Sequence, residues 1–594
     1  MEARFAIKMK YLLCLLLVSL ESKGAHWALD ADAASLKIHG TIKSASGALD
    51  QCLVLDGGSV IELKDSASLN ADPNGFTFSV WFNPYATEDG QQVIAGKNRY
   101  SLGERQWTLT VEPDGRLKLH VQQAGWMTIA SKEPLKAGHW YFATLTLDSG
   151  KAALFLNGEQ VGEARLRKPM PITQAPITLG GINDNSRRTQ MFTGAVDEAR
   201  FEPRALSAEE ITANYQPVTV THKIPKQIFA ETSLWDDRVK LPKAAEVPVL
   251  DGVAFHVIKA NEPEQDGYIW LHGVGLGWHK GKLYASFGHN KGEENTHGEE
   301  ARGRVSEDAG KSWGAPFTIG TGAGESDLSI SHGVFLSHRG RLWAFHGAFY
   351  GRMQKIHTRA FVLDETTGVW QSRGVVIDGG FWALNQPVKM ADGNWIMSGI
   401  KAGAFSESSK NPAAVAISHG DDLTKWDLVV IPSVDGLNMW GESGIIADGP
   451  NVMNIARFGA RAQALIAVSK NYGRTWIASA PGNLPMATSK PAAGILSTGQ
   501  RYLVCTTTAD SGGRRTPLTI ALSKPGESVF SRVFIIRPSI FPQGPGDVAD
   551  GASLSYPCAT EHEGKLYVGY SNSGGRKGNH NSAELAVIPI EKLK

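Results

Sequence analysis

The stretch Ser306-E-Asp308-A-Gly310-KS-Trp313 decides the fold of this chain. The same pattern recurs as Ser469-K-Asn471-Y-Gly473-RT-Trp476, with asparagine in the place of aspartate. A carboxylate or amide, a glycine and an aromatic residue at this spacing suit a tight hairpin turn whose side chains bond and pack locally. The motif is therefore expected to be structural, and its repetition is the informative feature.

The repeat predicts a β-propeller. Degenerate copies end in Trp370, Trp426 and Phe530, so the aromatic residues stand 57, 56, 50 and 54 positions apart. A period near 50 residues is typical of a repeated supersecondary unit. Each unit also carries apolar strand pairs, and four strands in a unit of that size make a propeller blade. The five aromatic residues and a final unit near 548–590 predict six blades, although seven blades are also compatible with the pattern. A strand at 249–258 would close the ring.

The chain before the repeats has a different pattern. Residues 26–216 alternate apolar and polar side chains at period two, with hairpin turns at Asp148-Ser-Gly and Asn157-Gly. A helix signal occurs at 206–215, where Ser207 and Glu210 form a capping box. This half is predicted to be an all-β sandwich. Residues 217–250, rich in proline and lysine, are predicted to be a linker, and residues 251–594 the propeller.

The composition excludes several classes of protein. Of 594 residues 42% are apolar and 20% charged, which excludes a disordered chain. Sixty Lys and Arg against 59 Asp and Glu give a net charge of +1, which argues against a nucleic-acid groove and against docking on anionic membranes. Glycine, at 65 residues, exceeds the usual ~7%, as turn-rich β-structure requires.

The first 25 residues are interpreted as a secretory signal peptide. Basic residues precede a short apolar run at 11–20, and small residues follow near Gly24 and Ala25. The run is shorter than the ~20 residues that span a membrane, and no later segment qualifies as a span. The mature protein is therefore expected in the periplasm or outside the cell.

Three segments of the first domain carry a family resemblance. The runs that begin at Gly75, Gly138 and Phe192 (GFTFSVWFNP, GHWYFATLTLDSGKAALFLNGEQVG and FTGAVDEARFEPRALSAEEITANY) resemble the laminin-G-like or concanavalin-like jellyroll. In secreted enzymes this resemblance implies an accessory domain that binds carbohydrate or packs against the catalytic domain.

The propeller resembles the sialidase superfamily of Asp-box proteins. Glu442 precedes a strand, and Arg457 follows 15 residues later in the fourth blade. Arg515 introduces a strand in the fifth blade, and Tyr556 lies in the sixth. The resemblance implies that Tyr556 is the nucleophile, that Glu442 is its base, and that Arg457 and Arg515 hold a substrate carboxylate. A structural ion pair of Glu442 and Arg457, with Tyr556 as a core ring, is the other interpretation.

Blade one departs from the family pattern. His272 stands near the position of the family's first arginine, and His289 follows 17 residues later. The family's acid/base aspartate has no clear counterpart. Glu299 is the candidate for that role, and Glu294 and His297 in the same loop are alternatives.

Histidines gather in blades one and two, and with their neighbours they suggest a second chemistry. His272, His289, Tyr350 and Arg352 are similar to the His/Tyr/Arg sites of propeller lyases that act on uronic acids, and His332 starts an inner strand of blade two. A zinc site at His289 and His297 is a further reading, but no compact ligand motif supports it, so no metal is predicted. A structural calcium ion stays open, and no other cofactor is predicted.

These patterns predict an all-β protein with an N-terminal jellyroll and a six-bladed propeller. Its predicted function is that of a secreted sialidase-like glycoside hydrolase acting on a terminal acidic sugar. The alternatives are a polysaccharide lyase that cleaves next to a uronic acid, and a glycan-binding protein without catalysis. The expected partner is an oligo- or polysaccharide that carries a carboxylate, with no nucleic acid and no membrane span.

Overall fold

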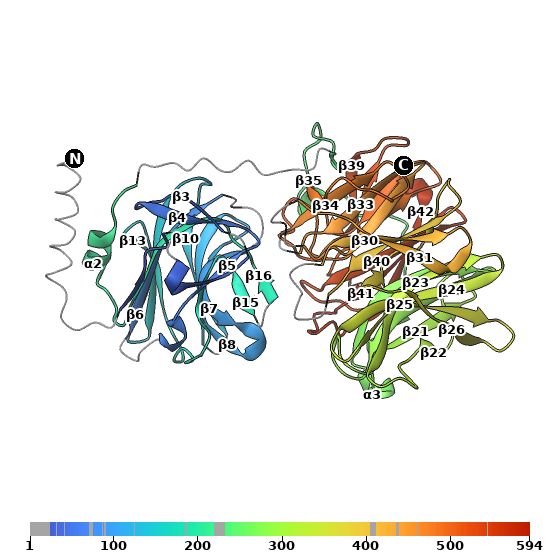
Figure 1. Cartoon of the computed structure of the whole chain (residues 1–594), viewed down its shortest axis with the longest axis horizontal. Coiled ribbons are helices and arrows are strands. Elements are labelled where there is room, and N and C mark those ends of the chain that lie inside the picture. Colours follow the sequence, from blue (N-terminus) through green and yellow to red (C-terminus); the bar gives the residue numbers. More distant parts are fainter. Residues whose placement is uncertain are drawn as a thin grey trace. The chain divides into compact units, whose positions relative to one another are not determined.

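The computed structural model describes residues 24–594 except 31–32, 41, 71–74, 86, 88–90, 124, 185–186, 219–231, 404–410, 435–436, 438, 460 and 543. The chain divides into two compact units, Met1–Pro225 and Lys226–Lys594, which Figure 1 colours from blue to green and from green to red. The predicted signal peptide lies, up to residue 23, outside the described residues, as does the part of the predicted linker at 219–231.

The first unit is a sandwich of two antiparallel sheets. One sheet has the order β13-β12-β11-β6-β17-β4-β3, with β1 beside β17, and the other has the order β10-β9-β8-β7-β14-β5-β2. The first sheet consists of β1 (Ala25–Trp27), β3 (Lys43–Ser46), β4 (Gln51–Asp56), β6 (Phe76–Pro84), β11 (Tyr141–Asp148), β12 (Lys151–Leu156), β13 (Glu159–Arg165) and β17 (Thr193–Glu202). The second consists of β2 (Leu36–His39), β5 (Val60–Leu63), β7 (Gln92–Arg99), β8 (Glu104–Val111), β9 (Arg116–Gln122), β10 (Trp126–Pro134) and β14 (Ile177–Leu179).

The alternation seen in the sequence fills the space between these sheets. Phe76, Phe78 and Trp107 lie in one core with residues of both sheets, and the Phe78 and Trp107 rings lie 4.8 Å apart. A short hairpin, β15 (Ile182–Asp184) and β16 (Arg187–Thr189), adds a separate two-stranded sheet. The predicted jellyroll is confirmed.

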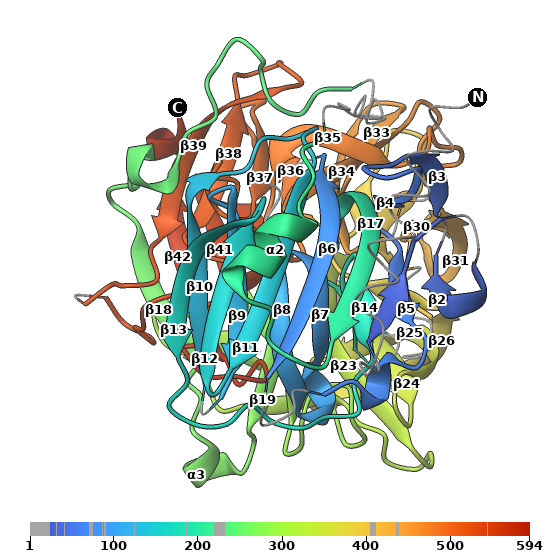
Figure 2. The same cartoon turned by 90° about the vertical axis from the view of Figure 1, so that its left-hand side faces the viewer.

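The predicted helix is α2 (Ala208–Asn214). Ser207 Oγ accepts from the Glu210 N–H (3.2 Å), and the Glu210 carboxylate accepts from the Ser207 N–H (2.8 Å). This is the capping box, which satisfies two backbone donors at the helix start. Figure 2 shows α2 lying across the sheet that contains β6, β11 and β12, where Ile211 packs against Phe155.

The second unit is a six-bladed β-propeller. Blade one contains β19 (Trp270–His279), β20 (Lys282–Asn290), β21 (Glu300–Ser306) and β22 (Phe317–Gly320). Blade two contains β23 (Leu328–His338), β24 (Arg341–Tyr350), β25 (Gln354–Asp364) and β26 (Val369–Ile377). Blade three contains β27 (Phe381–Ala383), β28 (Val388–Lys389), β29 (Trp395–Lys401), β30 (Ala413–His419) and β31 (Asp422–Val430). Blade four contains β32 (Ser443–Asp448), β33 (Asn451–Arg457), β34 (Gln463–Ser469) and β35 (Ala480–Pro485). Blade five contains β36 (Ala492–Ile495), β37 (Arg501–Val504), β38 (Leu518–Ser523) and β39 (Phe530–Arg537). Blade six contains β40 (Leu554–His562), β41 (Lys565–Asn572), β42 (Ser582–Pro589) and β18 (Ala254–Lys259). A four-residue helix, α3 (Pro263–Asp266), follows β18.

Blade six is completed from the other end of the propeller's sequence. β18, the first strand of this unit, pairs antiparallel with β42, the last. The predicted closing strand is therefore confirmed. Of the segment predicted as a linker, the part after residue 233 packs on the propeller, because Leu234 and Trp235 are buried in a core with Phe530, and the Leu250 N–H donates to Ile535 O at 2.9 Å.

The repeated motif forms the turn that its composition predicted. Asp308 Oδ1 accepts from the Ser306 hydroxyl and the Ser312 N–H, each at 2.8 Å, and Ser306 Oγ accepts from the Gly310 N–H at 2.7 Å. In the second copy Asn471 Oδ1 takes the place of Asp308 Oδ1, and the Asn471 amide donates to Thr475 Oγ1 at 2.9 Å. An amide and a carboxylate thus serve the same turn.

We expect Gly310→Ala to destabilise the propeller more than Gly281→Ala. Both glycines have left-handed backbone, with φ of 89° and 74°, which costs any other residue roughly 1–2 kcal/mol. A Cβ on Gly310 would also lie 2.4 Å from Leu585 Cδ2, whereas nothing lies within 4 Å of one on Gly281. Overpacking should add about 1–3 kcal/mol at Gly310 only. Urea unfolding of both variants tests this, and equal losses would contradict it.

Candidate active site

The site is built at one end of the propeller by irregular inner strands. The inner strands of blades one, two and six shift register between His272 and Gly275, between Ile330 and Gly333, and between Ser555 and Cys558. Such bulges change the direction in which a side chain points. They bring the rings of His272, His332 and Tyr556 together: the His272 and Tyr556 centroids lie 4.0 Å apart, and those of His332 and Tyr556 5.8 Å.

Tyr556 has a strained backbone. Its φ is 53°, in the left-handed region, which for a residue other than glycine costs of order 1–3 kcal/mol and is concentrated at functional sites. Its N–H donates to Ser489 Oγ at 3.2 Å. The fold therefore holds this tyrosine in a conformation that the chain would not adopt alone.

Glu442 joins Tyr556 to Arg457. The Tyr556 hydroxyl donates to Glu442 Oε1 in a short hydrogen bond, while Arg457 Nη1 lies 2.7 Å from Glu442 Oε2 and 3.5 Å from Tyr556 Oη. Glu442 and Tyr556 are 6% and 7% exposed. The Glu442 carboxylate therefore bridges the Tyr556 phenol and the Arg457 guanidinium at a nearly closed site. These two contacts fix the positions of the phenol and the guanidinium.

Arg515 provides a second cation. Its guanidinium carbon lies 5.6 Å from the centre of the Tyr556 ring, and its Nε and Nη2 donate to Thr488 O at 3.1 and 2.8 Å. These two bonds hold the guanidinium plane in place. With Arg457, it supplies the positive charge that could neutralise a ligand carboxylate.

The environment shifts the pKa values of these groups in different directions. Burial, followed by the charge of Glu442, raises the pKa of Tyr556 well above its usual value, so the phenol is protonated. Burial opposes the charge of Arg457, but Glu442 and Tyr556 outweigh it and raise its pKa. Burial and the neighbouring Arg457 lower the pKa of Arg515.

The two site histidines are neutral. Burial, followed by the charge of Arg515, lowers the pKa of His272 well below its usual value. Burial and Lys490 lower the pKa of His332 to about 3. Gly273 makes this packing feasible, because a Cβ at that position would lie 2.2 Å from Cγ of His332. At neutral pH both rings therefore act as uncharged hydrogen-bonding groups.

The loop between β20 and β21 carries two candidate acids, Glu294 and Glu299, which lie in different environments. Glu294 is half-buried and its charge acts on both Arg457 and Arg515; its Oε2 accepts from Asn579 Nδ2 at 3.0 Å. Glu299 is 1% exposed, and burial raises its pKa to about 8. Its Oε1 accepts from the Asn295 N–H. Glu294 thus makes a minor contribution to the electrostatics of both arginines, and Glu299 supports the loop from within.

Three other predicted site residues, His289, Tyr350 and Arg352, lie in surroundings different from that of Tyr556. The His289 ring stacks on Tyr268 at 4.0 Å, and burial, with Arg302, lowers its pKa to about 3. The Tyr350 hydroxyl donates to Glu325 Oε2 at 2.6 Å. Arg352 is exposed in the turn after β24. The structure does not join these three residues to the group around Tyr556.

Two residues at the site carried no sequence signal. Lys490 is 2% exposed and its Nζ donates to Leu384 O and Pro557 O, at 3.1 and 2.6 Å; burial lowers its pKa to about 8. Asn581 contacts His272. Neither belongs to a motif, because each acts through contacts between blades.

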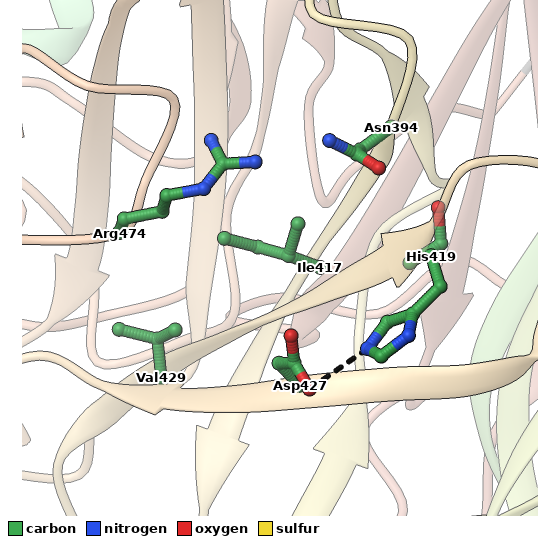
Figure 3. A pocket seen from close by; sticks show the side chains of 7 residues that line it. Asn394, Ile417, His419, Asp427, Val429 and Arg474 are labelled. Atoms are coloured by element: carbon green, nitrogen blue, oxygen red, sulfur yellow. Dashed lines mark hydrogen bonds and ion pairs between the residues drawn. The ribbon is translucent and has the colours of Figure 1, made fainter.

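The propeller has two cavities that are not lined by the residues around Tyr556. A cavity of about 250 Å³ follows the central channel and is lined by residues further along the same inner strands, including Gly275, Val334 and Cys558. A pocket of about 320 Å³ lies between blades three and four, at the end opposite Tyr556. Figure 3 shows His419 paired with Asp427 on its wall, at 2.9 Å, and Arg474 across from them.

Two features are absent from the described part of the chain, a metal-binding group of side chains and a membrane-spanning helix. Among those residues, no three His, Cys, Asp or Glu side chains are grouped to hold a metal ion, which includes His289, His297 and Glu299. Within the same residues, no helix has the length and apolarity of a membrane span. Cys52, Cys505 and Cys558 are buried, and no disulfide joins any two of them.

Comparison with known families agrees with the two folds. Residues 55–212 match the model of the concanavalin A-like lectin/glucanases superfamily, and residues 282–568 match the BNR repeat-like domain. A concanavalin-like jellyroll therefore precedes a six-bladed propeller with BNR repeats, as the sequence predicts. No curated protein matches the chain.

Several solved sialidase structures are similar over most of the chain. The NanB sialidase of Streptococcus pneumoniae is 11% identical, with a TM-score of 0.42, over 94% of this chain and 99% of that one. The leech intramolecular trans-sialidase is 11% identical, with a TM-score of 0.43, over 94% and 98%. A Hadza microbial sialidase is 12% identical, with a TM-score of 0.46, over 88% and 91%.

We expect Glu299→Gln to stabilise the protein increasingly as the pH rises. The folded-state pKa of Glu299, about 8, exceeds the unfolded value of 4.5, so the folded protein binds one more proton between these values. Stability is therefore lost as pH rises from 4.5 to 8, by up to about 1.4 kcal/mol per pH unit, and levels off above 8. The glutamine variant should escape this loss.

Thermal unfolding at pH 5, 6.5 and 8 measures the effect. Glu307→Gln is the matched control, because the Glu307 side chain is 72% exposed. A difference between Glu299→Gln and the parent protein that does not change with pH would contradict a raised pKa for Glu299.

Proposed function

We propose that this protein is a secreted glycan-active enzyme, a glycoside hydrolase that acts on a terminal sugar carrying a carboxylate. The observation that carries the proposal is the hydrogen bond from the Tyr556 phenol to Glu442, with Arg457 and Arg515 beside it. A nucleophile within hydrogen-bond reach of a base, which is itself oriented by a third group, is the arrangement of covalent catalysis. Tyrosine with a carboxylate base is the pairing known from sialidases.

The first step is attack by Tyr556. Arg457 and Arg515 bind the sugar carboxylate and neutralise its charge. Tyr556 Oη forms a bond to the anomeric carbon while Glu442 takes the phenolic proton. The raised pKa of Tyr556 makes this transfer necessary, because free tyrosinate is scarce near neutral pH.

Glu294 is the proposed acid for the leaving group. As the bond from the anomeric carbon to the aglycone breaks, its carboxylic proton moves to the aglycone oxygen. In the second step Glu294 accepts a proton from water, the water oxygen bonds to the anomeric carbon, and Tyr556 leaves with the proton returned by Glu442. The electrostatic effect of Glu294 on Arg457 and Arg515, and its partial exposure, support this role for Glu294 in preference to the buried Glu299.

A lyase is the second candidate, and one observation favours it: the His272 ring contacts the Tyr556 ring beside two arginines. In that reaction a base removes the proton next to the carboxylate, the glycosidic bond breaks by elimination, and an unsaturated uronate forms. The set His289, Tyr350 and Arg352 gives the lyase less support, since His289 and Tyr350 contact other groups and Arg352 is exposed.

We expect Tyr556→Phe to lower kcat by at least about 10³-fold, because it removes the nucleophile, and Glu442→Gln to lower it by about 10²–10⁴-fold, because it removes the base. Tyr570→Phe is the matched control. The Tyr570 hydroxyl also donates to a buried carboxylate, Glu584 Oε2 at 2.9 Å, but Tyr570 is fully buried. This control should keep its activity.

The assay combines two readouts on sialylated glycans and uronate polysaccharides. New reducing ends report hydrolysis, and ultraviolet absorbance reports an unsaturated uronate. Reducing ends without absorbance support the hydrolase. Absorbance that rises with cleavage would replace it with the lyase, and glycan binding without turnover would leave a binding protein.

A further inference from the structure

A buried amide fixes the hydrogen-bonding state of His272. Asn581 is 0% exposed and lies just before β42, next to the start of β19. Its Nδ2 atom lies 2.7 Å from Leu271 O and 3.1 Å from His272 Nδ1. One amide nitrogen therefore contacts a backbone carbonyl and an imidazole nitrogen of neighbouring residues.

The hydrogens on the Asn581 amide nitrogen determine which atom donates in each of these two hydrogen bonds. An amide nitrogen has two hydrogens and no lone pair that accepts. Leu271 O can only accept, so the Asn581 amide group must present its nitrogen here; the opposite orientation would place two acceptor oxygens 2.7 Å apart. The second hydrogen points to His272 Nδ1, which must then accept. The ring proton of neutral His272 is left on Nε2, at the edge of the ring away from Asn581.

The surroundings keep this ring neutral. The charged and titratable groups that face His272 come from four blades: Arg515, His332, Lys490, Arg457 and Tyr556. Three of them are cations, and the ring is 2% exposed. Burial and these cations lower the pKa of His272 well below its usual value. Protonation of Nδ1 is also opposed by the Asn581 donor.

We propose that Asn581 is a positioning residue that holds His272 as the neutral Nε2–H tautomer, so that His272 donates a hydrogen bond to a ligand oxygen beside Tyr556 and does not accept a proton. The site then contributes one neutral donor and two guanidinium groups to its ligand. This arrangement suits a sugar that presents a carboxylate to the arginines and a hydroxyl or carboxylate oxygen to His272.

The identity of that ligand rests on the proposed function, but the tautomer does not. A ring that carries its proton on Nε2 cannot remove a proton through that atom. His272 is therefore assigned to binding, and removal of protons at this site is left to Glu442 and Glu294.

The test is nitrogen NMR of the full-length protein labelled with ¹⁵N-histidine, near pH 7. His272→Gln identifies the His272 signals. We expect an unprotonated Nδ1 and a protonated Nε2. A protonated Nδ1, either in the other tautomer or in the imidazolium ion, would overturn the proposal. The measurement uses the parent protein, so it does not depend on the folding of a variant at Asn581.

Variants at Asn581 add a functional readout. Asn581→Asp places an acceptor beside Nδ1 and should move the ring proton there, which should lower kcat/KM at least tenfold and shift its pH profile. Asn572→Ala is the matched control, because Asn572 is an equally buried amide of blade six that bonds Asp547 O and Glu584 Oε1, each at 2.9 Å. It should leave the His272 signals and the pH profile unchanged. If Asn581→Asp left both readouts unchanged, the proposal would fail.

These outcomes are separable from the proposed function. An inactive protein whose His272 carries its proton on Nε2 would refute the hydrolase and retain the tautomer. An active hydrolase whose His272 carries its proton on Nδ1 would retain the function and refute the role of Asn581.

Discussion

The pairing of β18 with β42 is the contact on which the propeller depends. It joins the first strand of the unit to the last, and it converts six separate sheets into a closed ring. A ring without this pair would leave β42 as an exposed edge. Closure also sets the angle between neighbouring blades, and so it determines how close the inner strands of blades one, two and six come to one another. The geometry of the site is a consequence of that closure.

A tyrosine, a glutamate and an arginine meet at two places in the propeller, with different consequences. Tyr570, Glu584 and Arg537 are all buried, and Glu584 accepts from Tyr570, from Asn572 and from the Asp547 N–H. That carboxylate therefore has three protein donors, and the cluster is structural. Both oxygens of Glu442 also have a partner, one from Tyr556 and one from Arg457, but Glu442 and Tyr556 stay slightly exposed, at 6% and 7%. Residue type alone does not make an active site; access for a ligand is also needed.

The cations around Tyr556 are only partly compensated. Arg457 pairs with Glu442, whereas Arg515 and the buried Lys490 donate to backbone carbonyls. His272 and His332 add no charge, because burial beside cations keeps both neutral. An anionic ligand would therefore meet uncompensated positive charge as well as directed hydrogen bonds from two guanidinium groups and an imidazole. This suits recognition of one carboxylate within a larger neutral sugar.

The sandwich, the six blades, the closing strand and the helix cap could be predicted from the sequence, because alternation, a period near 50 residues and a capping box are local patterns. The sequence also suggested Glu442, Arg457, Arg515 and Tyr556, through the resemblance of their segments to the sialidase superfamily, and these four side chains lie together in the structure. The tertiary structure was needed to see that Glu299 is buried with a raised pKa, and that His289 and Tyr350 contact other groups. It alone revealed Lys490 and Asn581. Loops and contacts between blades have no period, so their geometry follows from how the blades pack and not from spacing along the chain.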